Sequence, residues 1–132
     1  MKITADTNVL VRAITGDDER QSRVAQARLA NADMVALAMP VLCELVWVLS
    51  QGYKIPSAEI AETIRRLMAG ANVVLNRPAA EAGLALLDAG GDFADGVIAY
   101  EGNWLGAQTF VSFDQKAVKL MDAQGKPSRL LS

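Results

Sequence analysis

The sequence predicts an α/β domain with a mainly parallel central sheet, and three observations lead to this class. Short apolar runs typical of strands alternate with amphipathic helical segments along the whole chain. Polar residues stand where strand candidates end, which is where parallel sheets place their sites. The length of 132 residues, with 52% hydrophobic residues, suits one compact domain with a core and is too short for two of ordinary size. We therefore expect a single domain over residues 1–132.

The elements of the first part follow from local patterns. Residues 2–5 form a strand candidate that runs into the polar cluster 6–8, which suits a strand end and a helix start. Residues 17–32 carry charges on one face and apolar residues on the other, as an amphipathic helix does. Residues 34–38 predict another strand. Pro40 then suits the first turn of a helix that ends near residue 51, before Gly52.

The second part continues the alternation. We expect, in chain order, a helix from 56 to about 70, a strand over 72–75, a helix over 78–87, a helix after 92, a strand over 108–112, a helix over 114–121 and a strand candidate over 128–131. Gly90-Gly91 breaks the chain before Asp92 caps the next helix. Together these segments predict a sheet covered by helices.

Charge and cysteine content narrow the function classes. The balance of 13 Lys and Arg against 15 Asp and Glu gives a net charge of −2, so the bulk charge does not indicate a strongly basic nucleic-acid-binding protein. The single Cys43 forms no internal disulfide and fits a reducing compartment. Neither a signal peptide nor a membrane-spanning stretch is recognisable. We expect a cytoplasmic protein.

Glu44 is the most informative residue, because it is the only charge in the apolar run 41–49. The sequence predicts that this carboxylate is buried, and a buried carboxylate needs a cation, a metal or hydrogen-bond donors. The chain has no His, which leaves a metal or an ion pair with a basic residue such as Arg12 or Lys116.

Three further carboxylates lie at predicted strand ends or near a helix start, where functional sites often form. Asp6 follows the first strand candidate, Asp95 lies one turn into a helix, and Asp114 follows the strand candidate 108–112. Gathered with Glu44, they would repel one another unless some were protonated or a hard cation such as Mg²⁺ or Mn²⁺ joined them. Such a metal site predicts hydrolysis of phosphodiester bonds without a catalytic histidine.

Each carboxylate also has a purely structural explanation. Asp92 and Asp114 are good helix N-caps, Asp95 gains from the helix dipole, and Asp6 suits a turn. Asp92 shares a helix face with Asp95 and is therefore a secondary candidate for the site. The supporting candidates, whose short polar side chains could hold a carboxylate or a metal-bound water, are Thr7, Asn8 and Ser112.

The stretches ITADTNVLVR (3–12), DFADGVIA (92–99) and FVSFD (110–114), together with Glu44, resemble the PIN domain family, most closely the VapC ribonuclease toxins of type II toxin–antitoxin modules. The resemblance implies a three-layer α/β/α sandwich. It also implies an Mg²⁺- or Mn²⁺-dependent endoribonuclease with Asp6, Glu44, Asp95 and Asp114 at the acidic positions.

The same resemblance implies a VapB-type antitoxin as partner and a homodimer. Arg12 and Lys116 are candidates for RNA contacts, because each is close in sequence to an acidic ligand. Gly96 and the pair Tyr100-Glu101 depart from the small residues common in the family, and neither departure removes a carboxylate.

Other functions compete with this interpretation. A metal-dependent DNA nuclease would use the same carboxylate chemistry. A catalytically inactive PIN module that binds RNA or protein is the second alternative. A phosphoacceptor signalling domain fits poorly, since Asp6 is followed by Thr7-Asn8 and Asp114 by Gln115, where that class needs a second acid and a lysine.

Overall fold

The computed structural model describes all 132 residues, which form seven α-helices, one π turn and five strands. They fall into two compact units, Met1–Asn76 (unit 1) and Arg77–Ser132 (unit 2), and each unit is described by itself. Every strand pairing is parallel.

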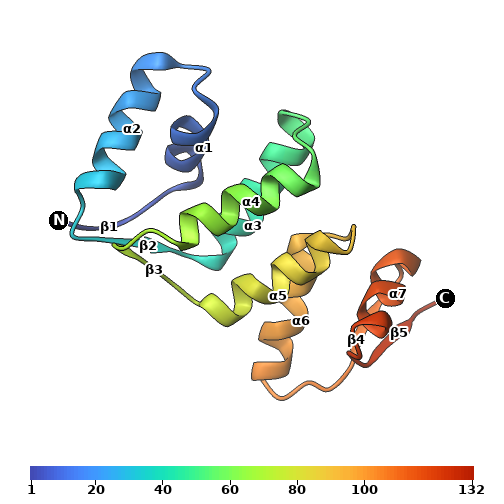
Figure 1. Ribbon diagram of the computed structural model, residues 1–132. Coiled ribbons are helices and arrows are strands. Elements are labelled where there is room, and N and C mark those ends of the chain that lie inside the picture. Colours follow the sequence, from blue (N-terminus) through green and yellow to red (C-terminus); the bar gives the residue numbers. More distant parts are fainter. The chain divides into compact units, whose positions relative to one another are not determined.

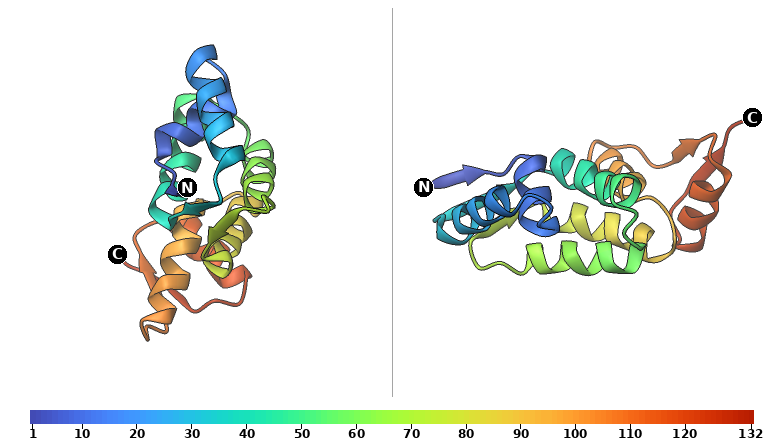
Figure 2. Two further views of the ribbon diagram at one scale, coloured as in Figure 1. Left: turned by 90° about the vertical axis from the view of Figure 1, so that its left-hand side faces the viewer. Right: turned by 90° about the horizontal axis from the view of Figure 1, so that it is seen from above.

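Unit 1 contains three strands, four α-helices and the π turn. In chain order they are β1 (Lys2–Thr4), α1 (Thr7–Thr15), α2 (Glu19–Asn31), β2 (Met34–Leu37), α3 (Met39–Trp47), the π turn η1 (Val48–Gly52), α4 (Ser57–Met68) and β3 (Val73–Leu75). The strands pair in the order β1-β2-β3, with Val35 opposite both Ile3 and Val73. Helices α1 and α2 lie side by side (Figures 1 and 2).

Caps and a shared core explain where the helices of unit 1 begin and pack. Asp6 and Asp18 are the N-caps of α1 and α2, and Gly16 ends α1 with a left-handed φ of 66°. The largest fully buried side chains of this unit come from five elements, namely Leu10, Val35, Leu42, Leu45, Leu49, Ile60 and Ile64. Burial of these aliphatic groups is the main force that holds α1, β2, α3, η1 and α4 together.

Unit 2 contains α5 (Arg77–Asp88), α6 (Phe93–Trp104), β4 (Phe110–Ser112), α7 (Gln115–Ala123) and β5 (Ser128–Leu130). Strands β4 and β5 pair with Val111 opposite Arg129. Helices α5 and α6 approach closely, because a Cβ on Gly96 would lie 2.3 Å from the carbonyl oxygen of Ala82. Gly96, which departs from the family pattern, is thus explained by helix packing.

The α/β class, the parallel pairing and the order of elements confirm the sequence prediction. One feature differs from the expected single sheet: the strands form two hydrogen-bonded sheets, one of three strands and one of two. None of the helices combines the length and the apolar character that crossing a membrane requires.

Candidate active site

Asp6 lies where β1 passes into α1, as the sequence predicts. Its side chain is exposed, and its Oδ1 accepts a hydrogen bond of 2.9 Å from the backbone N–H of Thr7. Thr7 is buried and Asn8 is exposed in the first turn of the helix. Asp6 therefore serves as a cap through one oxygen, while no hydrogen bond occupies its Oδ2.

Glu44 is exposed, so the expectation that it is a buried carboxylate was wrong. The reason is the helical period: α3 buries Met39, Leu42, Leu45 and Val46 on one face. Glu44 lies on the opposite face, where the side chain of Trp47 is 66% exposed. An ion pair with Arg12 is not formed either, since Arg12 pairs with Asp17.

Unit 2 brings three acidic side chains into one electrostatic environment. The pKa of Asp95 is raised, first because the carboxyl is partly desolvated, and second because the charges of Asp92 and Asp114 act on it. Asp95 lies in the first turn of α6, and Asp114 precedes α7. Within this unit, the charges of Asp92 and Asp114 thus influence Asp95.

Asp92 and Asp114 also cap helices, as their structural explanation predicted. Asp92 Oδ1 accepts from the N–H of Ala94 at 3.1 Å. Asp114 Oδ1 accepts from Lys116 at 2.9 Å and from Ala117 at 3.2 Å. Ser112 Oγ accepts the N–H of Asp114 at 2.9 Å and so holds the turn that presents this carboxylate.

The donor set suits a hard divalent cation. All candidate ligands are carboxylates, and the capping aspartates each leave Oδ2 without a hydrogen bond. A cation would also relieve the repulsion that raises the pKa of Asp95. Neither unit by itself gathers three acidic, His or Cys side chains tightly enough to hold a metal. Two of the four predicted ligands, Asp6 and Glu44, lie in unit 1, and the other two lie in unit 2.

Arg12, an RNA-contact candidate, is held in a polar network that the sequence did not reveal. Its Nη1 donates to Asp17 Oδ1 at 2.8 Å, and its buried Nε has no hydrogen-bond partner. Asp17 also accepts from Thr15 at 2.9 Å and from Tyr53 at 2.6 Å. Lys116, the other candidate, is exposed at the start of α7.

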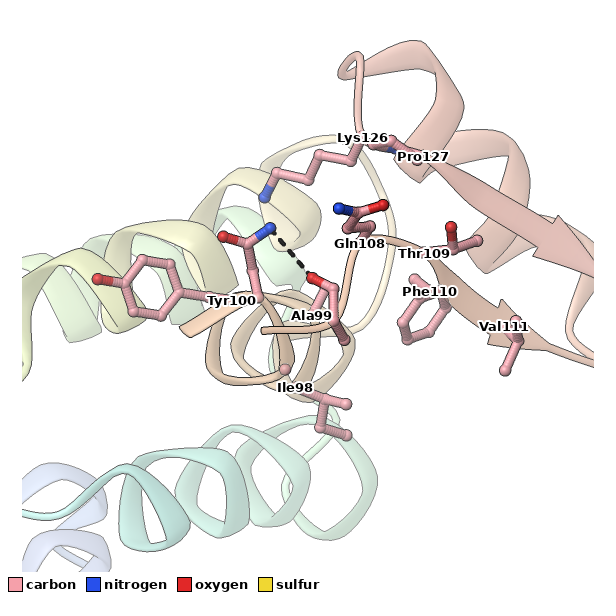
Figure 3. A pocket seen from close by; sticks show the side chains of 12 residues that line it. Ile98, Ala99, Tyr100, Gln108, Thr109, Phe110, Val111, Lys126 and Pro127 are labelled. Carbon is pink, nitrogen blue, oxygen red and sulfur yellow. Dashed lines mark hydrogen bonds between the residues drawn. The ribbon is translucent and has the colours of Figure 1, made fainter. Parts of the chain in front are cut away.

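A cavity of about 490 Å³ in unit 2 is not part of the predicted site. It lies between the second half of α6 and the segments that lead into β4 and β5, and its lining includes Ile98, Tyr100, Phe110 and Lys126 (Figure 3). None of the candidate metal ligands lines it.

The family of the chain follows from a comparison with known protein families. The model of the PIN domain matches residues 3–120, which include all four candidate ligands and extend through both units. No curated protein matches the sequence closely enough to give a nearer relative. PIN domains are typically metal-dependent nucleases. Because the match covers most of the chain, this protein belongs to the PIN domain family.

Proposed function

We propose that this protein is an Mg²⁺-dependent endoribonuclease toxin of a VapBC-type module, active in the cytoplasm and restrained by a VapB-type antitoxin. The observation that supports the nuclease proposal is the surroundings of Asp95, whose pKa is raised by partial desolvation and then by the charges of Asp92 and Asp114, in a chain that belongs to the PIN family. In this proposal Asp6 and Glu44 take the other two acidic positions that the resemblance implies. We further propose that the chain works as one PIN domain and as a homodimer.

In this proposal Asp6, Glu44, Asp95 and Asp114 supply the oxygen ligands, directly or through water. The metal would lower the pKa of a bound water and stabilise charge on the phosphoryl oxygens. Thr7 and Ser112 keep their neighbouring carboxylates in place, because the Thr7 N–H donates to Asp6 and Ser112 Oγ accepts from the backbone of Asp114. The second carboxylate oxygens of Asp6 and Asp114 remain available for ligation.

The test is cleavage of a mixed cellular RNA pool by antitoxin-free protein with Mg²⁺, with Mn²⁺ or with EDTA. Asp6→Asn runs beside the wild type, because asparagine caps a helix as well as aspartate and preserves the fold. Glu81→Gln is the matched control, since Glu81 is exposed on α5 and away from the family motifs. We expect discrete fragments from the wild type and from Glu81→Gln, and none with EDTA or from Asp6→Asn.

Two outcomes would contradict the proposal. Absence of cleavage by folded, metal-loaded protein over the whole pool would favour an inactive RNA- or protein-binding PIN module. Equal cleavage of single-stranded DNA would favour the broader metal-dependent nuclease. The toxin role predicts that expression of the chain arrests growth and that co-expression of a VapB-type antitoxin restores it. Light scattering of the purified chain tests the dimer.

A further inference from the structure

A hollow in unit 1 lies between α1 and α2, and we call it the α1–α2 groove. It has a volume of about 530 Å³. Its walls carry the three arginines Arg12, Arg20 and Arg28, and Val9 and Val24 supply apolar surface. The groove is thus a basic hollow in a chain whose net charge is −2.

Two of the three arginines of the groove form no ion pair. Arg12 is neutralised by Asp17, but neither Arg20 nor Arg28 forms an ion pair. Asp18 is the single acidic residue of the lining, and its Oδ1 caps α2 by accepting from the N–H of Gln21 at 3.0 Å. The guanidinium groups of Arg20 and Arg28 are therefore available to a ligand, and guanidinium binds phosphate through paired hydrogen bonds.

The two free arginines are arranged along a line. Arg20, Val24 and Arg28 follow one another at intervals of four residues, so they share one face of α2. Eight residues of helix span about 12 Å, roughly the length of three or four stacked nucleotides. A second hollow of about 480 Å³ shares Val24 and Arg28 with the groove and continues it toward the end of α2. This geometry suits an extended polyanion better than a single small ion.

The groove also begins next to a candidate catalytic residue. Asn8 lines it, and Asn8 lies in the first turn of α1, the helix that Asp6 caps. A chain held in the groove therefore passes the first turn of α1, two residues after Asp6. This continuity favours the nucleic-acid substrate over an acidic peptide.

We propose that the α1–α2 groove binds the phosphate backbone of single-stranded RNA a few nucleotides from the cleaved bond, with Arg20 and Arg28 as the phosphate contacts. The inference rests on the proposed ribonuclease function and adds the surface that holds the substrate. The apolar surface of Val9 and Val24 receives the ribose and base faces, so the groove holds RNA without reading its sequence.

The test measures binding of a fluorescent single-stranded oligoribonucleotide in EDTA, which separates binding from cleavage. The double variant Arg20→Ala/Arg28→Ala removes both contacts. Arg23→Ala is the matched control on the same helix, because Arg23 is 72% exposed, pairs with Glu19 at 3.5 Å and does not line the groove. We expect about tenfold weaker binding for the double variant, with a salt dependence reduced by about 0.7 for each lost phosphate contact. Arg23→Ala should bind within about twofold of the wild type, because Arg23 already pairs with Glu19 and does not line the groove.

Three outcomes would overturn this inference, and a fourth would overturn only the nuclease proposal. An equal loss of RNA affinity in Arg23→Ala, which removes half as much charge as the double variant, would indicate a diffuse electrostatic effect. Retained RNA binding by the double variant, with loss of binding to polyglutamate, would assign the groove to an acidic protein partner. If the wild type cleaves RNA and the double variant binds and cleaves like Arg23→Ala, the groove proposal fails while the nuclease proposal stands. If the wild type cleaves nothing but the double variant still loses RNA, the nuclease proposal fails and the groove remains an RNA-binding surface.

Discussion

The hydroxyl of Tyr53 donates a hydrogen bond of 2.6 Å to Asp17 Oδ2, although the two residues are 36 positions apart. The other oxygen of Asp17 accepts from Arg12 and from Thr15. These bonds lower the pKa of Asp17 from 3.8 to about 2, with the Tyr53 bond as the largest cause. Tyr53 and Asp17 thus fix the direction of Arg12, which forms part of the α1–α2 groove.

Tyr53→Phe should therefore raise the pKa of Asp17 toward its ordinary value. A carboxyl with a lowered pKa stabilises the folded state above its ordinary pKa, and this contribution disappears as the pH falls from 3.8 to about 2. The variant should be less stable than the wild type at pH 6, and the difference should shrink toward pH 2. Urea unfolding at both pH values measures it.

Tyr100→Phe is the control for this experiment, because the Tyr100 hydroxyl accepts from Trp104 at 3.0 Å and touches no carboxylate. The effect of Tyr100→Phe on stability should not change between pH 6 and pH 2. If the stability difference between Tyr53→Phe and the wild type is also the same at pH 6 and pH 2, Tyr53 does not lower the pKa of Asp17.

Asp95 should titrate above its ordinary pKa of 3.8 in metal-free protein, because desolvation and two neighbouring charges oppose its ionisation. The free energy of unfolding should fall as the pH rises from the ordinary pKa of 3.8 through the raised pKa of Asp95, since the folded state binds the proton more tightly than the unfolded state. Asp92→Asn should lower the pKa of Asp95 and keep the helix cap. Carboxyl ¹³C NMR measures the titration, and Asp122→Asn, on α7, is the control that should leave it unchanged.

Gly96→Ala should destabilise the protein, because the added methyl group would overlap the backbone of α5 at Ala82 and Gly83. Overpacking of this kind typically costs about 1–3 kcal/mol. Gly102→Ala, on the same helix, meets no atom within 4 Å and should instead stabilise by about 0.5–1 kcal/mol, because alanine favours the helix. Denaturant midpoints of both variants test the pair, and a neutral Gly96→Ala would contradict the close packing.

Glu44→Gln should leave the free energy of unfolding within about 0.5 kcal/mol of the wild type, because the side chain is exposed and forms no ion pair. On the proposed function it should weaken Mn²⁺ binding and reduce RNA cleavage about tenfold or more. Calorimetric titration with Mn²⁺ and the cleavage assay measure both, with Glu81→Gln as control. Unchanged cleavage would remove Glu44 from the proposed ligands.

The order of strands and helices could be predicted because periodicity, caps and breakers agree along the chain. Asp92 and Asp114 precede their helices as expected. The helix expected from residue 17 begins at Glu19, because Asp18 is the cap and Asp17 instead bonds Arg12 and Tyr53. A sequence does not show which of two adjacent aspartates caps a helix when the other has a distant partner.

The candidate site could be predicted less fully. The apolar run around Glu44 suggested burial, but hydrophobic content does not state which face of a helix meets the core. Arg20 and Arg28 resembled ordinary surface charges, and their four-residue spacing with Val24 becomes informative only when α1 lies alongside. The role of Tyr53 could not be predicted from the sequence, because its hydrogen-bond partner Asp17 is 36 residues away along the chain.

The π turn η1 has a consequence for insertions and deletions. The N–H of Tyr53 donates to the carbonyl of Val48, five residues earlier, so η1 holds one residue more per turn than an α-helix would. Removing one residue between 48 and 52 would restore ordinary helical winding and rotate Tyr53 away from Asp17. A deletion in η1 would therefore change the position of Arg12, through Tyr53 and Asp17, without altering any residue of the groove.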